Sequence, residues 1–468
     1  MKQMFLAAAS LLTLSACAVG PNYAAPKPPA SASEMFVAAK SAALVTNAPA
    51  QNDWWRLYQD PVLDKLIADA LASNTDIRVA VAHVAKARAL LREAGADRQP
   101  QVGFSGSTQY GRLPASQRPA GVNRENWNVD AGLNVSYEVD LFGRVSRNIE
   151  ASRADVEGAK ADADAVRVMV VAETVRAYAD VASTAARLDV AHHIVALLDR
   201  SLSLTRQRFE VGQGAALDVA RIAALREQRQ ANVPALQADH DAAVFRLALL
   251  TGRAPADLPA EAAARTDMLH LDQPIPVGDG ATLLARRPDI RAAERRLAGS
   301  TARIGVATAD LYPHITLGAS GGSTGFGFGN FLGAGPIGWL AGPLINWSLN
   351  QSAARARIAG AKADTQADLA TFDGTVLGAL QETETALSAY QHAMERAQAL
   401  QHARDEALRA AGIARDRQRE GAIDGLELLD TERTLADTEA DLATAKANIA
   451  ERQIDLFKAL GGGWQEKA

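Results

Sequence analysis

The chain has a single cysteine, Cys17, among its 468 residues, so an internal disulfide is excluded. Aromatic residues are scarce at 5%, whereas 48% of the residues are hydrophobic, and this balance favours long helices. The 49 basic residues are nearly balanced by 54 acidic residues and form no basic cluster that could bind phosphates. We therefore do not expect nucleic acid as a partner. After Cys17, no run reaches the roughly 18 uncharged apolar residues of a membrane helix. Stability must therefore come from packing and association.

The N-terminus has the features of an export signal. A charged start and the short apolar run Met4–Leu14 precede Leu14-Ser15-Ala16-Cys17, which resembles a bacterial lipobox. In that motif the cysteine carries a diacylglycerol on its thiol and an N-acyl chain, whereas ordinary cleavage at Ala16-Cys17-Ala18 is the alternative. We expect residues 1–16 to be a lipoprotein signal peptide and Cys17 to be the lipid attachment site, with no other cofactor.

The next segment, residues 17–53, is expected to be a lipid-anchored N-terminal tether. Four prolines between positions 21 and 29 lack a backbone donor and fix φ, so the segment is expected to form no regular element.

A tandem duplication organises the remainder of the chain. Asp76-Ile77-Arg78 returns as Asp289-Ile290-Arg291, 213 positions later, and Arg208–Gly212 is followed by a similar segment, Arg417–Gly421, 209 positions later. The predicted organisation is a first structural repeat at 54–252, a linker at 253–280, a second structural repeat at 281–461 and a C-terminal tail at 462–468.

Each repeat has the same order of periodicities: a helix, two strands, a long helix and a shorter helix. Alternating apolar and polar residues predict strands near 100–112 and 126–142, and again near 313–321 and 339–350. From Gly143 to Phe209 the absence of proline predicts one helix of ~65 residues, on the order of 100 Å long. A shorter helix is expected from Leu217 to Leu250, with a kink at Pro234. In the second repeat one helix is expected from Ala281 to Asp310.

Strands with one apolar and one polar face fit a sandwich edge, or a barrel wall with lipid outside and water inside. Four such strands cannot close a barrel, and open sheet edges are not tolerated in lipid. If the strands lie in a membrane, the chain must therefore associate with further copies.

Several sequence blocks resemble the outer-membrane efflux factors, the TolC-type channels, and specifically the lipoprotein branch that serves resistance-nodulation-division pumps. They occur in the family's order and cover nearly all of the chain after Cys17. The blocks are Trp54-Trp55, Asn74, Asp76-Ile77-Arg78, Tyr137 to Gly143, Arg286 to Glu294, Ile304 to Ala307 and Leu311-Tyr312-Pro313.

The resemblance implies a fold that is mixed α and β, mainly α. The tandem-duplicated protomer would form a homotrimer with a 12-stranded outer-membrane β-barrel continued by a 12-column α-helical periplasmic barrel. The expected partners are outer-membrane lipid, a periplasmic adaptor (membrane fusion) protein and an inner-membrane resistance-nodulation-division pump. The expected function is a passive export duct for small molecules, lipid-anchored and barrel-inserted in the cell outer membrane.

The resemblance also implies a periplasmic gate formed by Asp218, Glu427 and Asp430, just after the helix turns. Glu427 and Asp430 stand i, i+3 on one helical face, and threefold symmetry would bring the copies of each together near an axis. Helix capping is the alternative, because Asp424 and Glu427 have the spacing of a capping box at a helix start.

Three glycines mark the same turns. Gly212, Gly214 and Gly421 are expected to adopt the left-handed conformation that ends a helix. The resemblance implies that this turn contacts the adaptor. The sequence departs from the family's pattern here, so nearby arginines such as Arg417 and Arg419 are candidate partners for the gate carboxylates.

A lipid-anchored periplasmic coiled-coil scaffold or adaptor without a pore would also explain the helices. It has no need for four amphipathic strands placed symmetrically between them. The sequence contains no nucleophile–base constellation, cofactor loop or metal-ligand spacing, so we expect no catalytic or metal-binding residues and no enzyme activity.

Overall fold

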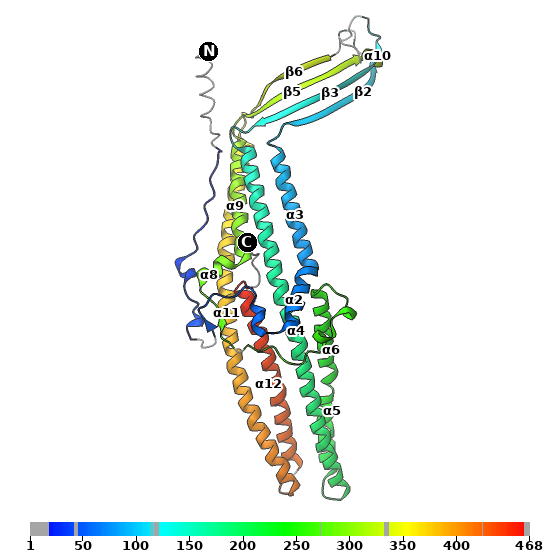
Figure 1. Ribbon diagram of the computed structural model, residues 1–468, viewed down its shortest axis with the longest axis vertical. Helices are drawn as coiled ribbons and strands as arrows, with labels where there is room; N and C mark the ends of the chain where they lie inside the picture. Colours follow the sequence, from blue (N-terminus) through cyan, green and yellow to red (C-terminus); the bar gives the residue numbers. More distant parts are fainter. Residues whose placement is uncertain are drawn as a thin grey trace. The chain divides into compact units, whose positions relative to one another are not determined.

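The computed structural model describes residues 18–41, 45–112, 114, 116, 121–271, 273–331, 337–423 and 425–462 (Figure 1). The predicted signal peptide, Cys17 and most of the C-terminal tail lie outside these residues. The chain divides into two compact units, and each takes segments from both predicted repeats. Unit 1 comprises Met1–Lys27, His83–Lys160 and Ala292–Asp373, and unit 2 comprises Pro28–Ala82, Ala161–Arg291 and Gly374–Ala468.

Helices make up most of the fold. The two longest, α4 and α11, have 67 and 68 residues, so the prediction of a very long helix after Gly143 is confirmed. One stretch of α4 is long and apolar enough to cross a membrane by length and composition, as the core helix of a soluble protein can also be, and 39% of it is buried. The main helices are α2 (Pro61–Ser73), α3 (Thr75–Ala96), α4 (Arg144–Glu210), α5 (Ala216–Gln230), α6 (Val233–Leu250), α8 (Gly280–Arg286), α9 (Pro288–Ala309), α11 (Ser352–Arg419) and α12 (Gly425–Ala459).

Prolines break two helices that the sequence predicted to be continuous. The expected kink at Pro234 is a full break, because α5 ends at Gln230 and α6 begins at Val233 with Pro234 in its first turn. The expected helix from Ala281 to Asp310 is likewise split into α8 and α9 at Arg287, directly before Pro288. Proline is favoured in the first turn of a helix, where its missing N–H has no partner to lose. At the second break Arg287 also has the extended backbone that a following proline favours.

The prediction that the N-terminal segment forms no regular element is wrong. It contains two 3-10 turns and a short strand, β1 (Val45–Thr46), which pairs in parallel with β4 (Ile275–Pro276). The backbone N–H groups of Val37 and Ala38 donate to the carboxylate of Glu384 at 2.6 and 2.9 Å, and Phe36 is buried in the core of unit 2. Tertiary contacts therefore supply hydrogen-bond partners for backbone groups of this segment, which its prolines keep from forming a regular hydrogen-bond ladder.

Unit 1 contains a four-stranded antiparallel sheet in the order β2-β3-β5-β6. Its registers pair Val102 with Val135, and Ala319 with both Val135 and Ala341. All four predicted strands are present, and β5 extends beyond the expected end at 321 to Phe326. The strands are β2 (Gln101–Arg112), β3 (Glu125–Val139), β5 (His314–Phe326) and β6 (Ile337–Asn346).

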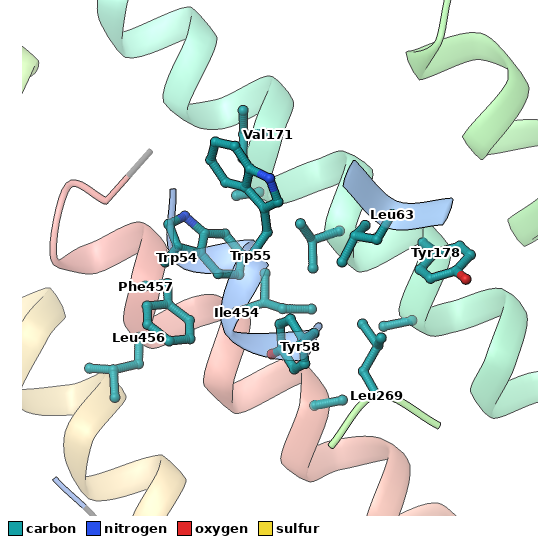
Figure 2. Close-up of a cluster of buried hydrophobic side chains, with 14 of the residues drawn as sticks. Trp54, Trp55, Tyr58, Leu63, Val171, Tyr178, Leu269, Ile454, Leu456 and Phe457 are labelled. Carbon is teal, nitrogen blue, oxygen red and sulfur yellow. The ribbon is translucent and has the colours of Figure 1, made fainter. Parts of the chain in front are cut away.

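Unit 2 is built around an aromatic core (Figure 2). Trp54 is fully buried and stacks on Phe457 of α12, with ring centroids 4.5 Å apart, and its Nε1–H donates to the carbonyl of Gly462 at 3.2 Å. Tyr178 of α4 donates through its hydroxyl to Asp60, whose carboxylate also caps the N-terminus of α2. The first helical residues of the first repeat are thus packed against the last helix of the second.

The two repeats use the same contact at their helix breaks. The Asn74 side chain lies between α2 and α3 and donates to the carbonyl of Leu250, the last residue of α6, at 3.0 Å. Arg287 lies between α8 and α9 and donates to the carbonyl of Ala459, the last residue of α12, at 2.9 Å. Leu250 and Ala459 are 209 positions apart, so the duplicated sequence keeps the contact although its donor has changed from an amide to a guanidinium.

Replacing Trp54 tests the aromatic core. Trp54→Ala removes a fully buried indole and should lower the free energy of unfolding by about 3–5 kcal/mol, as measured by chemical denaturation of the detergent-solubilised protein. Trp54→Phe keeps a stacking ring and should cost clearly less. Equal losses in the two variants would mean that the stacking contributes little.

A half-buried carboxyl in unit 2 gives a pH-dependent prediction. Burial of Asp180 on α4, together with the carboxylate of Glu451, raises the Asp180 pKa from its ordinary 3.8 to about 6. The folded state therefore favours protonated Asp180, and the stability present below pH 3.8 is lost as the pH rises through about 6. Asp180→Asn should raise the Tm at pH 8 and add nothing near pH 4. A gain of the same size at both pH values would contradict this assignment.

Candidate functional site

The sheet of unit 1 has one apolar face and one mostly polar face. Because side chains alternate along a strand, the observed registers collect apolar residues from all four strands on one side. This face carries Val102, Phe104, Leu133, Val135, Tyr137, Leu317, Trp339 and Ile345. The opposite face of β2, β3 and β5 carries mainly Ser, Thr, Asn, Gln, Asp and Gly. The alternation predicted for a barrel wall is therefore present in three of the four strands.

Strand β6 departs from that alternation. Leu340 and Leu344 lie on the otherwise polar face, opposite Ser320 and Thr316 of β5, and both are strongly exposed. Trp339 and Ile345 are exposed on the other face, so this outer strand is apolar on both sides. The expected polar face of the fourth strand is therefore wrong. Strands β2 and β6 flank the sheet, and each pairs on one side only within the described residues.

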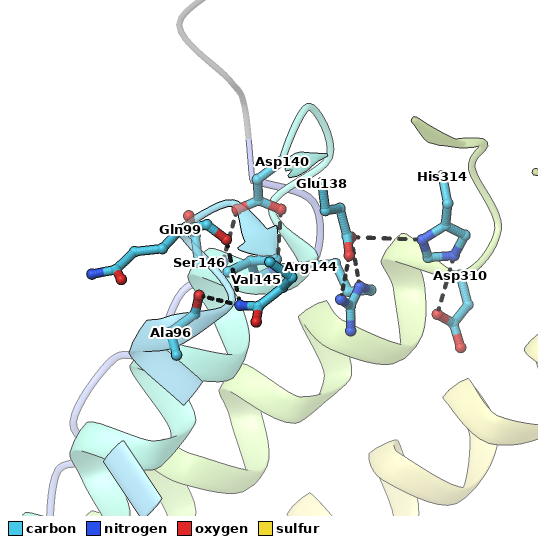
Figure 3. Close-up of polar contacts among 10 residues, drawn as sticks. Ala96, Gln99, Glu138, Asp140, Arg144, Val145, Ser146, Asp310 and His314 are labelled. Carbon is cyan, nitrogen blue, oxygen red and sulfur yellow. Dashed lines mark hydrogen bonds and ion pairs between the residues drawn. The ribbon is translucent and has the colours of Figure 1, made fainter. Parts of the chain in front are cut away.

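Ion pairs fix the junction between the strands and the helices (Figure 3). Arg144, the first residue of α4, holds Glu138 of β3 in a two-pronged contact, with Nε 2.8 Å from Oε1. Asp140 accepts from the backbone N–H groups of Val145 and Ser146 and thus caps α4. His314 of β5 lies 3.8 Å from Glu138. These contacts hold the ends of two neighbouring strands against the start of α4.

The turns that follow the long helices are built alike. Gly212 and Gly421 have φ of 77° and 75°, which confirms the predicted left-handed conformation. After each glycine the next residue donates back into the helix: Gln213 to Arg208 and Ala422 to Arg417, both at 2.8 Å. This is the Schellman pattern of helix termination.

For Gly214 the prediction of a left-handed conformation is wrong, because its φ is not positive. Its need for a small residue is steric instead. A Cβ there would lie 3.2 Å from the backbone nitrogen of Phe209, so the chain passes close to the end of α4.

The structure places the three gate candidates at the starts of α5 and α12. Asp218 is half-buried in the first turn of α5, and a Cβ on Gly425 would lie 3.0 Å from its carboxyl carbon. Glu427 lies in the first turn of α12, 3.9 Å from Arg417, and Asp430 is exposed one turn further on. Asp424, the other half of the capping alternative, lies outside the described residues.

A buried ion pair near the same turn was not predicted. Arg415 of α11 contacts Glu432 of α12 through two bonds of 2.6 and 2.7 Å, and the Glu432 side chain is only 3% exposed. The Glu432 carboxylate raises the pKa of Arg415. A signal was available in the sequence, because Glu432 stands between Leu428 and Leu435 at the spacing of a coiled-coil seam. The neighbouring Arg419 pairs with Asp416 on its own helix.

Breaking this pair should destabilise the α11–α12 hairpin. Arg415→Met leaves a buried carboxylate without its partner and should cost about 3 kcal/mol in the free energy of unfolding. Replacing both partners, by R415M with E432L, should recover most of that loss. Arg409→Met removes an exposed pair with Glu406 and should cost less than about 1 kcal/mol. Equal effects of the two single variants would contradict the distinction.

Comparisons with known proteins agree with this architecture. The family profile described as outer membrane efflux protein matches residues 66–253 and 281–462. The chain is 30% identical to the antibiotic efflux pump outer membrane protein ArpC of Pseudomonas putida, covering 100% of this chain and 96% of ArpC. It is 31% identical to the toluene efflux pump outer membrane protein TtgF, also of Pseudomonas putida, covering 99% of this chain and 98% of TtgF.

The fold has a close counterpart in a solved structure. The outer-membrane channel OprN superposes with a TM-score of 0.88 and 36% sequence identity, covering 96% of this chain and 100% of OprN. Because the profile matches both repeats and the relatives match nearly end to end, the chain belongs to the outer membrane efflux protein family.

Proposed function

We propose that this chain is the outer-membrane channel component of a tripartite efflux system, a passive export duct for small molecules in the cell outer membrane. The observation that carries the proposal is the sheet of unit 1, whose apolar face suits lipid and whose opposite face suits water. A pore-free scaffold would have no use for such a sheet, and the family to which the chain belongs is one of channels.

The channel is a homotrimer in this proposal. Within one copy β2 and β6 are flanking strands, and unpaired backbone N–H and C=O groups are not tolerated in lipid. Pairing β6 of one copy with β2 of the next removes every edge. Three copies then give twelve strands, an even number within the range of bacterial outer-membrane barrels.

A periplasmic adaptor docks at the two helix turns and connects the channel to an inner-membrane resistance-nodulation-division pump. Apolar side chains are exposed beside these turns: Val211 at 69%, Leu217 at 57% and Leu426 at 51%. Leu217 and Leu426 occupy the same position in the two repeats, directly after the turns at Gly212–Gly214 and Gly421. The two turns therefore offer the adaptor two similar apolar contacts.

Asp218, Glu427 and Asp430 form the periplasmic gate in this proposal. Carboxylates at the starts of α5 and α12 would meet their copies around a threefold axis and repel one another or attract cations. Cys17 carries the diacylglycerol and the N-acyl chain that anchor the chain to the outer membrane.

Single-channel recording in planar bilayers tests the duct and the gate. The purified protein should have a trimer's mass in detergent and a small conductance that prefers cations. The double replacement E427A with D430A should raise the conductance, because it removes two carboxylates from each copy at the closed end.

The matched control is E406A with D416A, which removes two exposed acids of α11 and should leave the conductance unchanged. An unchanged conductance in the gate variant would assign Glu427 and Asp430 to helix capping. A monomer or dimer that never conducts would refute the duct.

A further inference from the structure

A cavity of about 300 Å³ lies within unit 2, beside the break between helices α5 and α6. Its walls come from α4, from the end of α5 and the start of α6, and from α12, so both repeats contribute to it (Figure 1). Small-molecule sites have volumes of about 300–1,000 Å³, and this cavity is at the lower end of that range. The described residues that line it include no gate candidate, no turn glycine and no residue of the sheet.

Arg229, in the last turn of α5, brings an unused hydrogen-bond donor to the wall of this cavity. Its Nη2 donates to the carboxylate of Asp437 on α12 at 2.6 Å. Its Nε is buried and has no hydrogen-bond partner among the described residues. A buried N–H without an acceptor destabilises the fold, so an acceptor bound in the cavity would remove a cost that the protein alone leaves in place.

A second guanidinium lines the same cavity. Arg187 of α4 is half-buried, yet it has no hydrogen bond and no ion pair with any residue that the structure describes. The acidic residue of the described lining is Asp239, which is exposed and forms no ion pair with either arginine. Guanidinium groups present planar N–H donors that match a carboxylate. The unused donors of the cavity therefore suit an anionic group.

Most of the remaining wall is apolar. Ile194 of α4 and Ala443 of α12 are buried, whereas Val190 of α4 and Leu236 of α6 are half-buried. An apolar group placed against these side chains would be removed from water, which is favourable in proportion to the area covered. An inorganic anion would gain nothing from this wall, so the lining favours an organic anion.

We propose that this cavity binds a small organic anion with an apolar body, of about the size of a monocyclic aromatic carboxylate. Its carboxylate accepts from Arg187 and from Nε of Arg229, and its ring lies against Val190, Ile194 and Leu236. Because α4 and α6 belong to the first repeat and α12 to the second, the bound anion joins the two repeats. Binding at this site does not depend on the trimer, the gate or the duct proposed above.

Titration of the full-length protein in detergent with para-trifluoromethylbenzoate, followed by fluorine NMR, tests the site. Wild type should bind the probe saturably, above a blank of empty micelles. Arg187→Met should raise the Kd at least about tenfold, because it removes a charge-assisted contact. Since Arg187 has no partner in the fold, R187M leaves no group unpaired and should keep the wild-type Tm.

The matched control is Arg206→Met, which removes an exposed arginine of α4 outside the lining and should leave the Kd unchanged. A wild type without saturable binding, or equal binding by R187M, would overturn the site.

A second pair of variants tests the place of binding. Ala235 and Ala238 are both exposed on α6, and of the two Ala235 lines the cavity. Ala235→Glu puts a carboxylate beside the two arginines, where it competes with the probe, so binding should be lost. The first turn of a helix favours an acid, so this variant should fold. Ala238→Glu should bind like wild type, and binding retained by A235E would place the probe elsewhere and refute the proposal.

Two further probes separate the charge of the ligand from its apolar body. The neutral para-trifluoromethylbenzamide should bind at least about tenfold more weakly than the benzoate, because it cannot form a charge-assisted bond. Sulfate at the same concentration should not displace the benzoate. An amide that binds as tightly would contradict the anion site, and displacement by sulfate would contradict the contribution of the apolar wall.

Discussion

The requirement that every backbone polar group in a membrane be hydrogen-bonded governs this chain. Its sheet is apolar on one face, yet its flanking strands β2 and β6 each pair on one side only within the part of the chain that the structure describes. In lipid such edges cost several kcal/mol per unpaired group, more than a side-chain substitution can offset. Pairing of these two strands with further copies would remove the edges.

The duplication gives the chain two similar sets of helices and strands, and the helix breaks show how the two repeats diverged. Asn74 and Arg287 each hold the last carbonyl of the final helix of their own repeat. Only Arg287 is charged, and it also pairs with Asp289 and with Glu382 of α11. Each contact ties the end of the last helix to a break in the first, so the repeat is closed on itself. Because Arg287 is charged, it also pairs with Glu382, and this pair brings α11 into the contact of the second repeat.

The strands and the long helices were predictable from the sequence, but the exact positions at which helices break were not. Periodicity predicted the four strands and the long helices because each extends over about ten residues or more. The breaks at Ala231–Asn232 and Arg287 were missed, because a proline in a helical pattern allows either a kink or a new start, and tertiary contacts choose between them. At the turns, the glycines indicated tight backbone, yet only Gly212 and Gly421 needed a positive φ. The contacts of Ala18–Tyr23 with α4 and α9 were missed because Gly20 and Pro21 also fit an extended chain that binds nothing.

The coiled-coil seam of α12 shows the role of Glu432, which was not predicted from the sequence. Leu428, Leu435, Leu442 and Ile449 recur every seven residues, but the positions between them are Glu432, Glu439 and Lys446, where a coiled coil would usually place apolar residues. A purely apolar seam packs in several registers, whereas a buried carboxylate is tolerated only beside its guanidinium.

The first hairpin, formed by α4 and α5, lacks such a buried ion pair. It has Arg206 at the position of Arg415 but Ala223 at the position of Glu432. Its α4 and α5 are joined instead by the pair of Asp199 and Arg226, in which the aspartate side chain is 50% exposed. Because an exposed pair is screened by water, it selects a register only weakly. We infer that the Arg415–Glu432 pair fixes the register of the α11–α12 hairpin, whereas apolar packing carries most of that task in the first hairpin.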